Sequence, residues 1–177
     1  IERSPLDLHR LGSSRDFGVE VTGSLLSDDR LHYDLMFANG SSNRAEINRG
    51  KKIMASLGYD LTDELTVEVY GDWNDEPGAA DVYTGQLFLA YQNGGVRLGA
   101  LAARQQQERV GPDLERRLAS AFGSAAVSNR IRVFARIDRM FDPNPEGPSI
   151  DYLPFAPASA STLIIGGIDV EPREDIH

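Results

Sequence analysis

Apolar and polar residues alternate with a period of two along most of this chain. In residues 16–26, Val19 and Val21 fall on one side, while Glu20 and Thr22 fall on the other. Such alternation is typical of a β-strand with two unlike faces. It recurs in eight further segments: 31–39, 53–61, 65–73, 83–91, 96–104, 118–127, 130–141 and 162–170. The sequence therefore predicts an all-β fold of about nine strands.

One stretch is ambiguous by this criterion. The seventh segment, Leu118 to Val127, is rich in Ala and Ser, so its two faces are hard to assign. Residues 112–121 are also compatible with a short helical turn after Pro112.

Short and long connections alternate along the chain. Short turns at 27–30, 62–64, 93–95 and 128–129 alternate with longer polar loops at 40–50, 74–81, 107–116 and 142–160. In an antiparallel up-and-down sheet this alternation places all short turns at one rim and all long loops at the other. That is the plan of a transmembrane β-barrel of the bacterial outer membrane.

The same alternation fits two classes of protein. A soluble β-barrel or sandwich that binds a small ligand would point its apolar face inward, whereas a membrane barrel would point it toward lipid. Lipid is favoured because charge is almost absent from the apolar face between Phe17 and Ile137, and Lys51 and Lys52 are the only lysines. Expected strand lengths of about 9–11 residues also suit a tilted membrane strand.

Aromatic residues of the apolar face gather near the predicted strand ends. Amphipathic rings prefer the two membrane interfaces, so this placement indicates two aromatic belts. The short-turn belt would contain Tyr33, Tyr59 and Tyr91, and the long-loop belt Phe17, Phe37, Trp73, Tyr83 and Phe141.

Nine strands are awkward for a closed membrane barrel, because single-chain bacterial barrels have an even number and an open edge in lipid leaves backbone groups unpaired. We expect the chain to be part of a larger barrel, with a miscount of eight or ten strands and assembly from several chains as alternatives. Residues 1–14 would be a connecting segment or loop, and residues 15–177 the barrel strands with their turns.

Charged and amide side chains occupy the polar face. We expect them to line a water-filled lumen, either as a selectivity ladder or as solvated wall residues. The candidate channel-lining residues are Glu20, Asp34, Glu68, Asp72 and Gln86 on early strands, and Arg97, Arg130, Arg132 and Arg136 on later ones. His32, Asp60, Asp138 and Asp169 share this face.

Nothing in the sequence predicts catalysis, a metal site or a cofactor. Glu68 and Asp72 lie on one face but about 13 Å apart along a strand, too far to share a proton. His32 has no nucleophile beside it, and no ligand spacing joins it to His9 and His177. A net charge of −9 argues against nucleic acid as a partner, and the absence of Cys excludes disulfides.

The loop at 142–160 is long and rich in Pro, and it carries Tyr152, Leu153 and Phe155. It is open to three interpretations: folding into the lumen, contacting a neighbouring protomer, or lying exposed at the surface.

Several segments resemble the phosphate-selective type of Gram-negative outer-membrane porin. They are the Glu2-Arg3-Ser4 segment, the strand that opens Ser14-Arg15-Asp16, the stretch 33–40, the Tyr59-Asp60-Leu61-Thr62 turn entry and Tyr83-Thr84-Gly85-Gln86. The resemblance implies an internal portion of a trimeric channel with a closed barrel of about sixteen strands. Phosphate selectivity does not carry over, because that family uses a lysine cluster and this chain has almost no lysine.

We therefore expect an outer-membrane porin: a passive diffusion channel for small hydrophilic or anionic solutes, without enzymatic activity. Its expected partners are lipid, lipopolysaccharide, the permeating solute and further copies of itself in a trimer. The alternatives are the soluble ligand-binding β-barrel and, less favoured, a membrane-barrel enzyme or adhesin.

Overall fold

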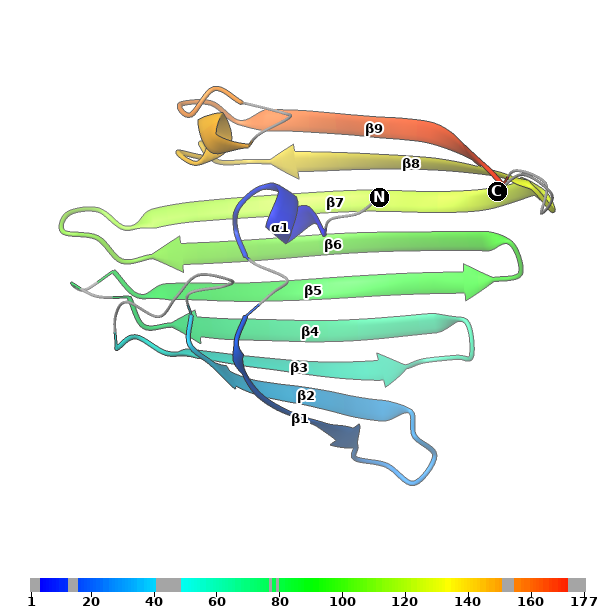
Figure 1. Cartoon of the computed structure of the whole chain (residues 1–177), viewed down its shortest axis with the longest axis horizontal. Helices are drawn as coiled ribbons and strands as arrows, with labels where there is room; N and C mark the ends of the chain where they lie inside the picture. Colours follow the sequence, from blue (N-terminus) through cyan, green and yellow to red (C-terminus); the bar gives the residue numbers. More distant parts are fainter. Residues whose placement is uncertain are drawn as a thin grey trace.

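A computed structural model describes residues 4–12, 16–40, 49–76, 78, 80–150 and 155–171 (Figure 1). Its main element is one sheet of nine strands. The strands are β1 (Gly18–Ser24), β2 (Leu31–Ala38), β3 (Lys52–Asp60), β4 (Leu65–Asn74), β5 (Val82–Asn93), β6 (Val96–Gln107), β7 (Leu114–Ser128), β8 (Ile131–Met140) and β9 (Ser161–Val170). Two short helices accompany them, α1 (Pro5–Leu8) and the 3-10 helix η1 (Gly147–Ser149).

Each strand pairs in antiparallel fashion with the next strand in the chain, so the order in the sheet is the order in the sequence. The predicted all-β, up-and-down arrangement is confirmed. The sheet is open: within the described part of the chain, β1 and β9 are its two edges.

The connections follow the predicted alternation. Figure 1 shows the short turns at the right-hand rim and the long loops at the left-hand rim. The turn between β5 and β6 contains Gly94 with a φ of +54°, a conformation that glycine adopts without steric cost.

The seventh strand corrects the sequence interpretation of residues 112–121. β7 begins at Leu114, four residues before the predicted start, and no helical turn forms there. Leu114 pairs with Gln107, and the ladder continues from that point along β6. The hydrogen bonds of this ladder therefore outweigh the weak local preference of residues 112–121 for a helical turn.

Strand length varies more than the alternation predicts. β3, β4, β8 and β9 have 9 or 10 residues, whereas β1 has 7 and β7 has 15. The longest strands, β5 to β7, lie in the centre of the sheet.

A small core lies on the polar face of the sheet. Segment 4–12, which contains α1, lies across this face at β6 and β7 (Figure 1). Leu6 and Leu11 of this segment pack against Leu101, Leu118 and Met140. The polar face is therefore the face that buries apolar side chains, and it does so across one half of the sheet.

The opposite face, which carries the regular apolar pattern, is open along the whole sheet. Its side chains include Val19 at 72% exposure, Leu87 at 51% and Ile164 at 75%. Among the described residues, no helix has the length and apolar character needed to cross a membrane.

Candidate functional site: the polar face of the sheet

The register places the predicted channel-lining residues of the strands on one face. Asp34 lies opposite Ser56 of β3, and Ser56 lies opposite Tyr70 of β4. Tyr70 in turn lies opposite Gln86 of β5. The alternation that assigned these residues to one side of each strand therefore places them on the same face of the sheet in neighbouring strands as well.

Carboxylates dominate the half of this face formed by β1 to β4. Glu20 is exposed, and Asp34, Asp60 and Glu68 are partly exposed. The Ser56 hydroxyl donates a hydrogen bond of 3.0 Å to Asp34. These carboxylates keep contact with solvent, because nothing in the described structure covers them completely.

Asp72 differs from these carboxylates because its charge is locally compensated. Its side chain is 3% exposed and lies 3.3 Å from the ammonium of Lys52. The Tyr70 hydroxyl donates a further hydrogen bond of 2.6 Å to it. Lys52, which the sequence did not assign to the site, is thereby neutralised by a neighbour.

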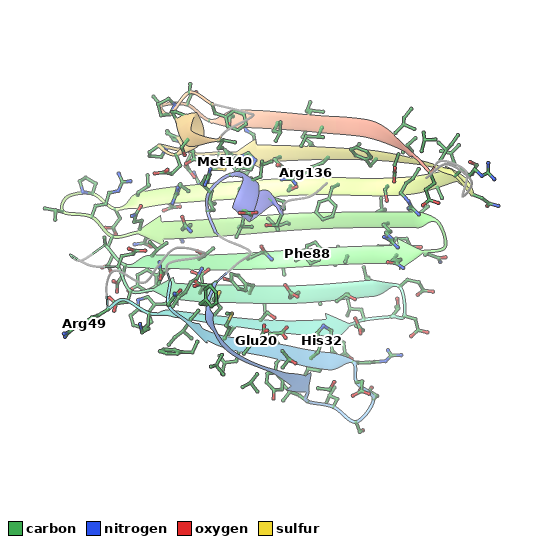
Figure 2. The ribbon with its side chains drawn as sticks, viewed as in Figure 1. Glu20, His32, Arg49, Phe88, Arg136 and Met140 are labelled. Atoms are coloured by element: carbon green, nitrogen blue, oxygen red, sulfur yellow. The ribbon has the colours of Figure 1, made fainter. Side chains whose placement is uncertain are left out.

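Of the two β8 arginines that were predicted to line a lumen, Arg136 is covered. Arg136 is 3% exposed and donates hydrogen bonds of 2.7 and 2.5 Å to Asp138. Ser120 donates to the same carboxylate at 2.6 Å, and the Nε2 atom of His9 lies 3.0 Å from it. Figure 2 shows Arg136 and Met140 beside α1, while Glu20 and His32 lie on the other half of the sheet.

Arg116 is a second covered arginine, and the sequence analysis missed it. It is 6% exposed and donates to the side chains of Gln105 and Asn144. The ambiguous assignment of residues 112–121 concealed it: had β7 been extended to Leu114, parity would have placed Arg116 on the polar face.

The remaining predicted arginines lie at the short-turn ends of their strands. Arg97 is near the start of β6, and Arg130 precedes β8 directly. Arg132 is opposite Asp169 and donates to Ser124 at 3.3 Å. Of the four predicted arginines, Arg136 is thus covered and the other three lie at the short-turn rim.

Segment 4–12 was expected only as a connection, yet it is built into the polar face. The Ser4 hydroxyl accepts a hydrogen bond from the Asp7 amide, and Pro5 occupies the first helical turn, two standard signals of a helix start. Gln105 donates to the carbonyl of Leu11, and Asn144 donates to that of His9 at 2.8 Å. Backbone groups of the segment are therefore held by side chains from two distant elements.

The described part of the 142–160 loop folds over the same half of this face. Ile150 is buried with Leu8 of α1 and Leu163 of β9, and Phe155 packs against this cluster. The Phe155 ring also stacks on that of His9 with centroids 5.7 Å apart. The described residues of the loop therefore pack on the polar face of the sheet; Tyr152 and Leu153 lie outside them.

A cavity of about 300 Å³ separates segment 4–12 from the carboxylate half. Ser4, Leu6 and Asp7 line one side of it, and Tyr70 and Asp72 line the other. The cavity has oxygen-bearing side chains on both sides.

One charged pair at the long-loop rim joins β7 to the loop after β8. Arg117 donates two hydrogen bonds, of 2.9 and 2.8 Å, to the carboxylate of Asp142, the second residue after β8. These hydrogen bonds hold the pKa of Asp142 below its ordinary value.

The arrangement offers polar contacts and fixed charge rather than a reactive constellation. Within the described ranges, no cluster of three or more His, Asp or Glu side chains is placed to hold a metal ion. A comparison with protein-family models gave no match, and neither did a comparison with curated proteins.

Proposed function

We propose that this chain forms part of the wall of a membrane-spanning β-barrel and that its polar face lines a passive channel for small hydrophilic solutes. The observation that carries the proposal is the continuous apolar face, which runs across all nine strands with large side chains open to the surroundings. Soluble monomers rarely expose a contiguous apolar patch beyond a few hundred Å². A lipid environment supplies the missing apolar contact.

The distribution of charge on the apolar face supports the same environment. Within the described strands, this face carries only four charged residues: Arg104, Glu115, Arg117 and Arg139. All four lie within four residues of a long-loop end, and Arg104 pairs with Glu115 at 3.0 Å. A charge there meets headgroups or water, whereas an arginine at mid-bilayer costs about 2–4 kcal/mol.

Aromatic side chains bracket the uncharged region of this face. Trp73 and Tyr83 lie opposite one another at the long-loop ends of β4 and β5, and the Trp73 indole donates to Asp81 of the adjoining loop at 3.0 Å. Tyr59 and Tyr91 lie near the short-turn ends of β3 and β5. Rings in these positions suit the two interfaces of a bilayer.

The resemblance to phosphate-selective porins gives this proposal a setting, namely a trimer in a Gram-negative outer membrane. In that setting both sheet edges pair with further strands, because a bilayer offers no hydrogen bonds to a free edge. Solutes cross by diffusion along the polar face, with no bond made or broken.

The test measures whether the protein inserts into a lipid bilayer and then conducts ions. The full chain, assembled with the strands that complete its barrel and refolded in detergent, is added to planar bilayers of neutral lipid, and we expect stepwise increases in ionic current. The competing soluble ligand-binding barrel makes a different prediction: a monomer that stays dispersed without detergent, resists insertion and passes no current. That result would overturn the proposal.

A further inference from the structure

The two halves of the polar face differ in which charges a solute can reach. On β6 to β8, Arg116 and Arg136 are 6% and 3% exposed, beneath segment 4–12 and the adjoining loop. On β1 to β4, Glu20, Asp34 and Glu68 are partly or fully exposed. Beneath the segment the arginines are covered, whereas Arg97 and Arg130 of the same half stay exposed at the short-turn rim; on β1 to β4 the carboxylates are open.

Segment 4–12 covers the sheet through buried side-chain contacts. Leu6 and Leu11 are 7% and 2% exposed, and they pack with Leu118 and Met140 of the sheet. His9 is 1% exposed, and its ring lies between Asp138 and the Phe155 ring. A segment with this much enclosed surface stays docked while solutes pass.

The docked segment contributes one carboxylate, that of Asp7, to the cavity beside the sheet, whereas its one arginine, Arg10, is not part of the cavity lining and donates to the carbonyl of Ser149. Asp7 and Asp16 line the 300 Å³ cavity together with Asp72. Two further carboxylates lie beside the cavity on the polar face. Glu68 is next to Tyr70 on that face of β4, and Asp34 is next to Met36 on that face of β2; each lies two residues nearer the short turns than its cavity-lining neighbour. A solute that passes the segment therefore meets carboxylates on both sides.

We infer that segment 4–12 sets the sign of the channel's charge selectivity: by covering the arginine half and leaving the carboxylate half open, it makes the passage prefer small cations. The inference rests on the proposed channel function and narrows its solute class. It departs from the anionic solutes that the sequence left open, because Arg116 and Arg136, the two arginines beside the segment, are enclosed.

The other cations of this face do not offset the carboxylates beside the segment. Lys52 is paired with Asp72 at 3.3 Å. Arg97, Arg130 and Arg132 lie at the short-turn rim of β6 to β8, away from the cavity lining, and Arg132 is opposite Asp169. His32 also lies on the carboxylate half, in β2.

The physical basis is the field of fixed charge in a narrow aqueous passage. Carboxylates that line a constriction raise the local concentration of cations and lower that of anions. Mobile salt screens this effect over about 10 Å at 0.1 M ionic strength. Selectivity should therefore be strongest in dilute salt.

The first experiment is a reversal-potential measurement on the same assembled barrel in neutral lipid under a KCl gradient, at about pH 8. We expect the sign that reports K⁺ as more permeant than Cl⁻, with a smaller effect at high salt. A Cl⁻-selective or unselective current would overturn the inference and leave the channel proposal standing. A complete absence of current would overturn the channel proposal, and the inference with it.

The second experiment removes open carboxylates. In Asp34→Asn/Glu68→Gln, the K⁺ to Cl⁻ permeability ratio should fall toward unity. The matched control is Asp113→Asn/Glu115→Gln, which removes the same two charges at the long-loop rim; Glu115 belongs to the apolar face there and Asp113 accepts from Gln106 of that face. An equal fall in both variants, or no fall in the first, would overturn the inference.

The third experiment displaces the segment. Leu6→Gln/Leu11→Gln, which adds no charge, should undock residues 4–12, expose Arg116 and Arg136, raise the conductance and shift the reversal potential toward anions. If that variant does not insert, Leu6→Ala/Leu11→Ala weakens the same contact more gently and should shift the potential in the same direction. A variant that inserts with higher conductance and unchanged selectivity would contradict the role given to the segment.

Discussion

Asp138 illustrates at the scale of one residue how the covered half is stabilised. Its side chain is fully enclosed and accepts hydrogen bonds from Arg136 and Ser120, with His9 at 3.0 Å. A buried ion pair gains little over well-packed apolar residues, but breaking it leaves an uncompensated charge, which costs about 3–5 kcal/mol. The pair therefore matters more for what its loss would do than for the stability that it adds.

We predict that Asp138→Ala lowers the free energy of unfolding by about 3–5 kcal/mol. Arg136→Met/Asp138→Leu should recover most of that loss, because neither side chain then carries a buried charge. Guanidinium unfolding in detergent, followed by the fluorescence of Trp73, the single tryptophan, provides the measurement. A single variant as stable as the double variant would show that the carboxylate does not neutralise Arg136.

The Asp142–Arg117 pair at the long-loop rim predicts a pH dependence. The pKa of Asp142 in the folded chain is lowered by the hydrogen bonds from Arg117, so its contribution to stability is fully present above the ordinary carboxyl pKa of about 3.9. That contribution is lost as the pH falls through the lowered value. The two side chains are partly exposed, and the effect should be small.

The measurement compares the wild type with Asp142→Asn. The wild type should have the higher unfolding midpoint near neutral pH, and the gap should close in acid below the ordinary carboxyl pKa. A gap that persists unchanged into strong acid would mean that the pair does not act through its charge.

At the scale of the element, the prediction concerns which face of a strand meets lipid. Leu87 lies at the middle of β5 on the apolar face, opposite Val69, while the adjacent Glu68 points to the polar face. Leu87→Arg should block membrane assembly, because an arginine on the lipid side costs about 2–4 kcal/mol at mid-bilayer. Glu68→Arg should assemble and shift the ion preference.

Assembly is measured by heat-dependent mobility on gels and by protection of the strands from protease in liposomes. The reverse outcome, with Leu87→Arg assembled and Glu68→Arg not, would invert the assignment of the two faces.

The elements differ in how far the sequence alone predicts them. The nine strands follow from alternation because each one needs only its own residues and a neighbour adjacent in sequence. The start of β7 escapes this reasoning because residues 114–117 do not alternate: Glu115 and Arg117 lie on the apolar face, and the strand conformation follows from pairing with the end of β6.

Segment 4–12 escapes it more completely. α1 has only four residues, too few to show a helical period. The contacts that hold the segment link Leu11 to Gln105 and His9 to Asp138 and Asn144, all about a hundred or more positions away in the chain. The site was therefore predicted as a set of residues on one face, but not as two halves with different exposure.

At the scale of the whole molecule, the open edges lead to a prediction about barrel closure. β1 and β9 each pair on one side only within the described chain. In a bilayer their outer backbone groups need partners, since each unsatisfied group there costs several kcal/mol. We therefore predict that hydrogen exchange of the inserted protein protects every amide of β1 and β9, not alternate ones.

Peptide-level exchange in liposomes tests this expectation, with the central strands β4 and β5 as the internal standard. Fast exchange at half of the β9 amides, alongside slow exchange throughout β5, would show that the edge stays unpaired and that the sheet does not close.

The nearest-neighbour order of the strands has a consequence for the history of such a chain. Within the described residues each strand pairs only with its predecessor and successor, so a hairpin duplicated or deleted in the gene adds or removes two ladders and leaves the other registers intact. In the proposed barrel, the circumference would therefore change in units of one hairpin while the alternation of inward and outward residues is kept.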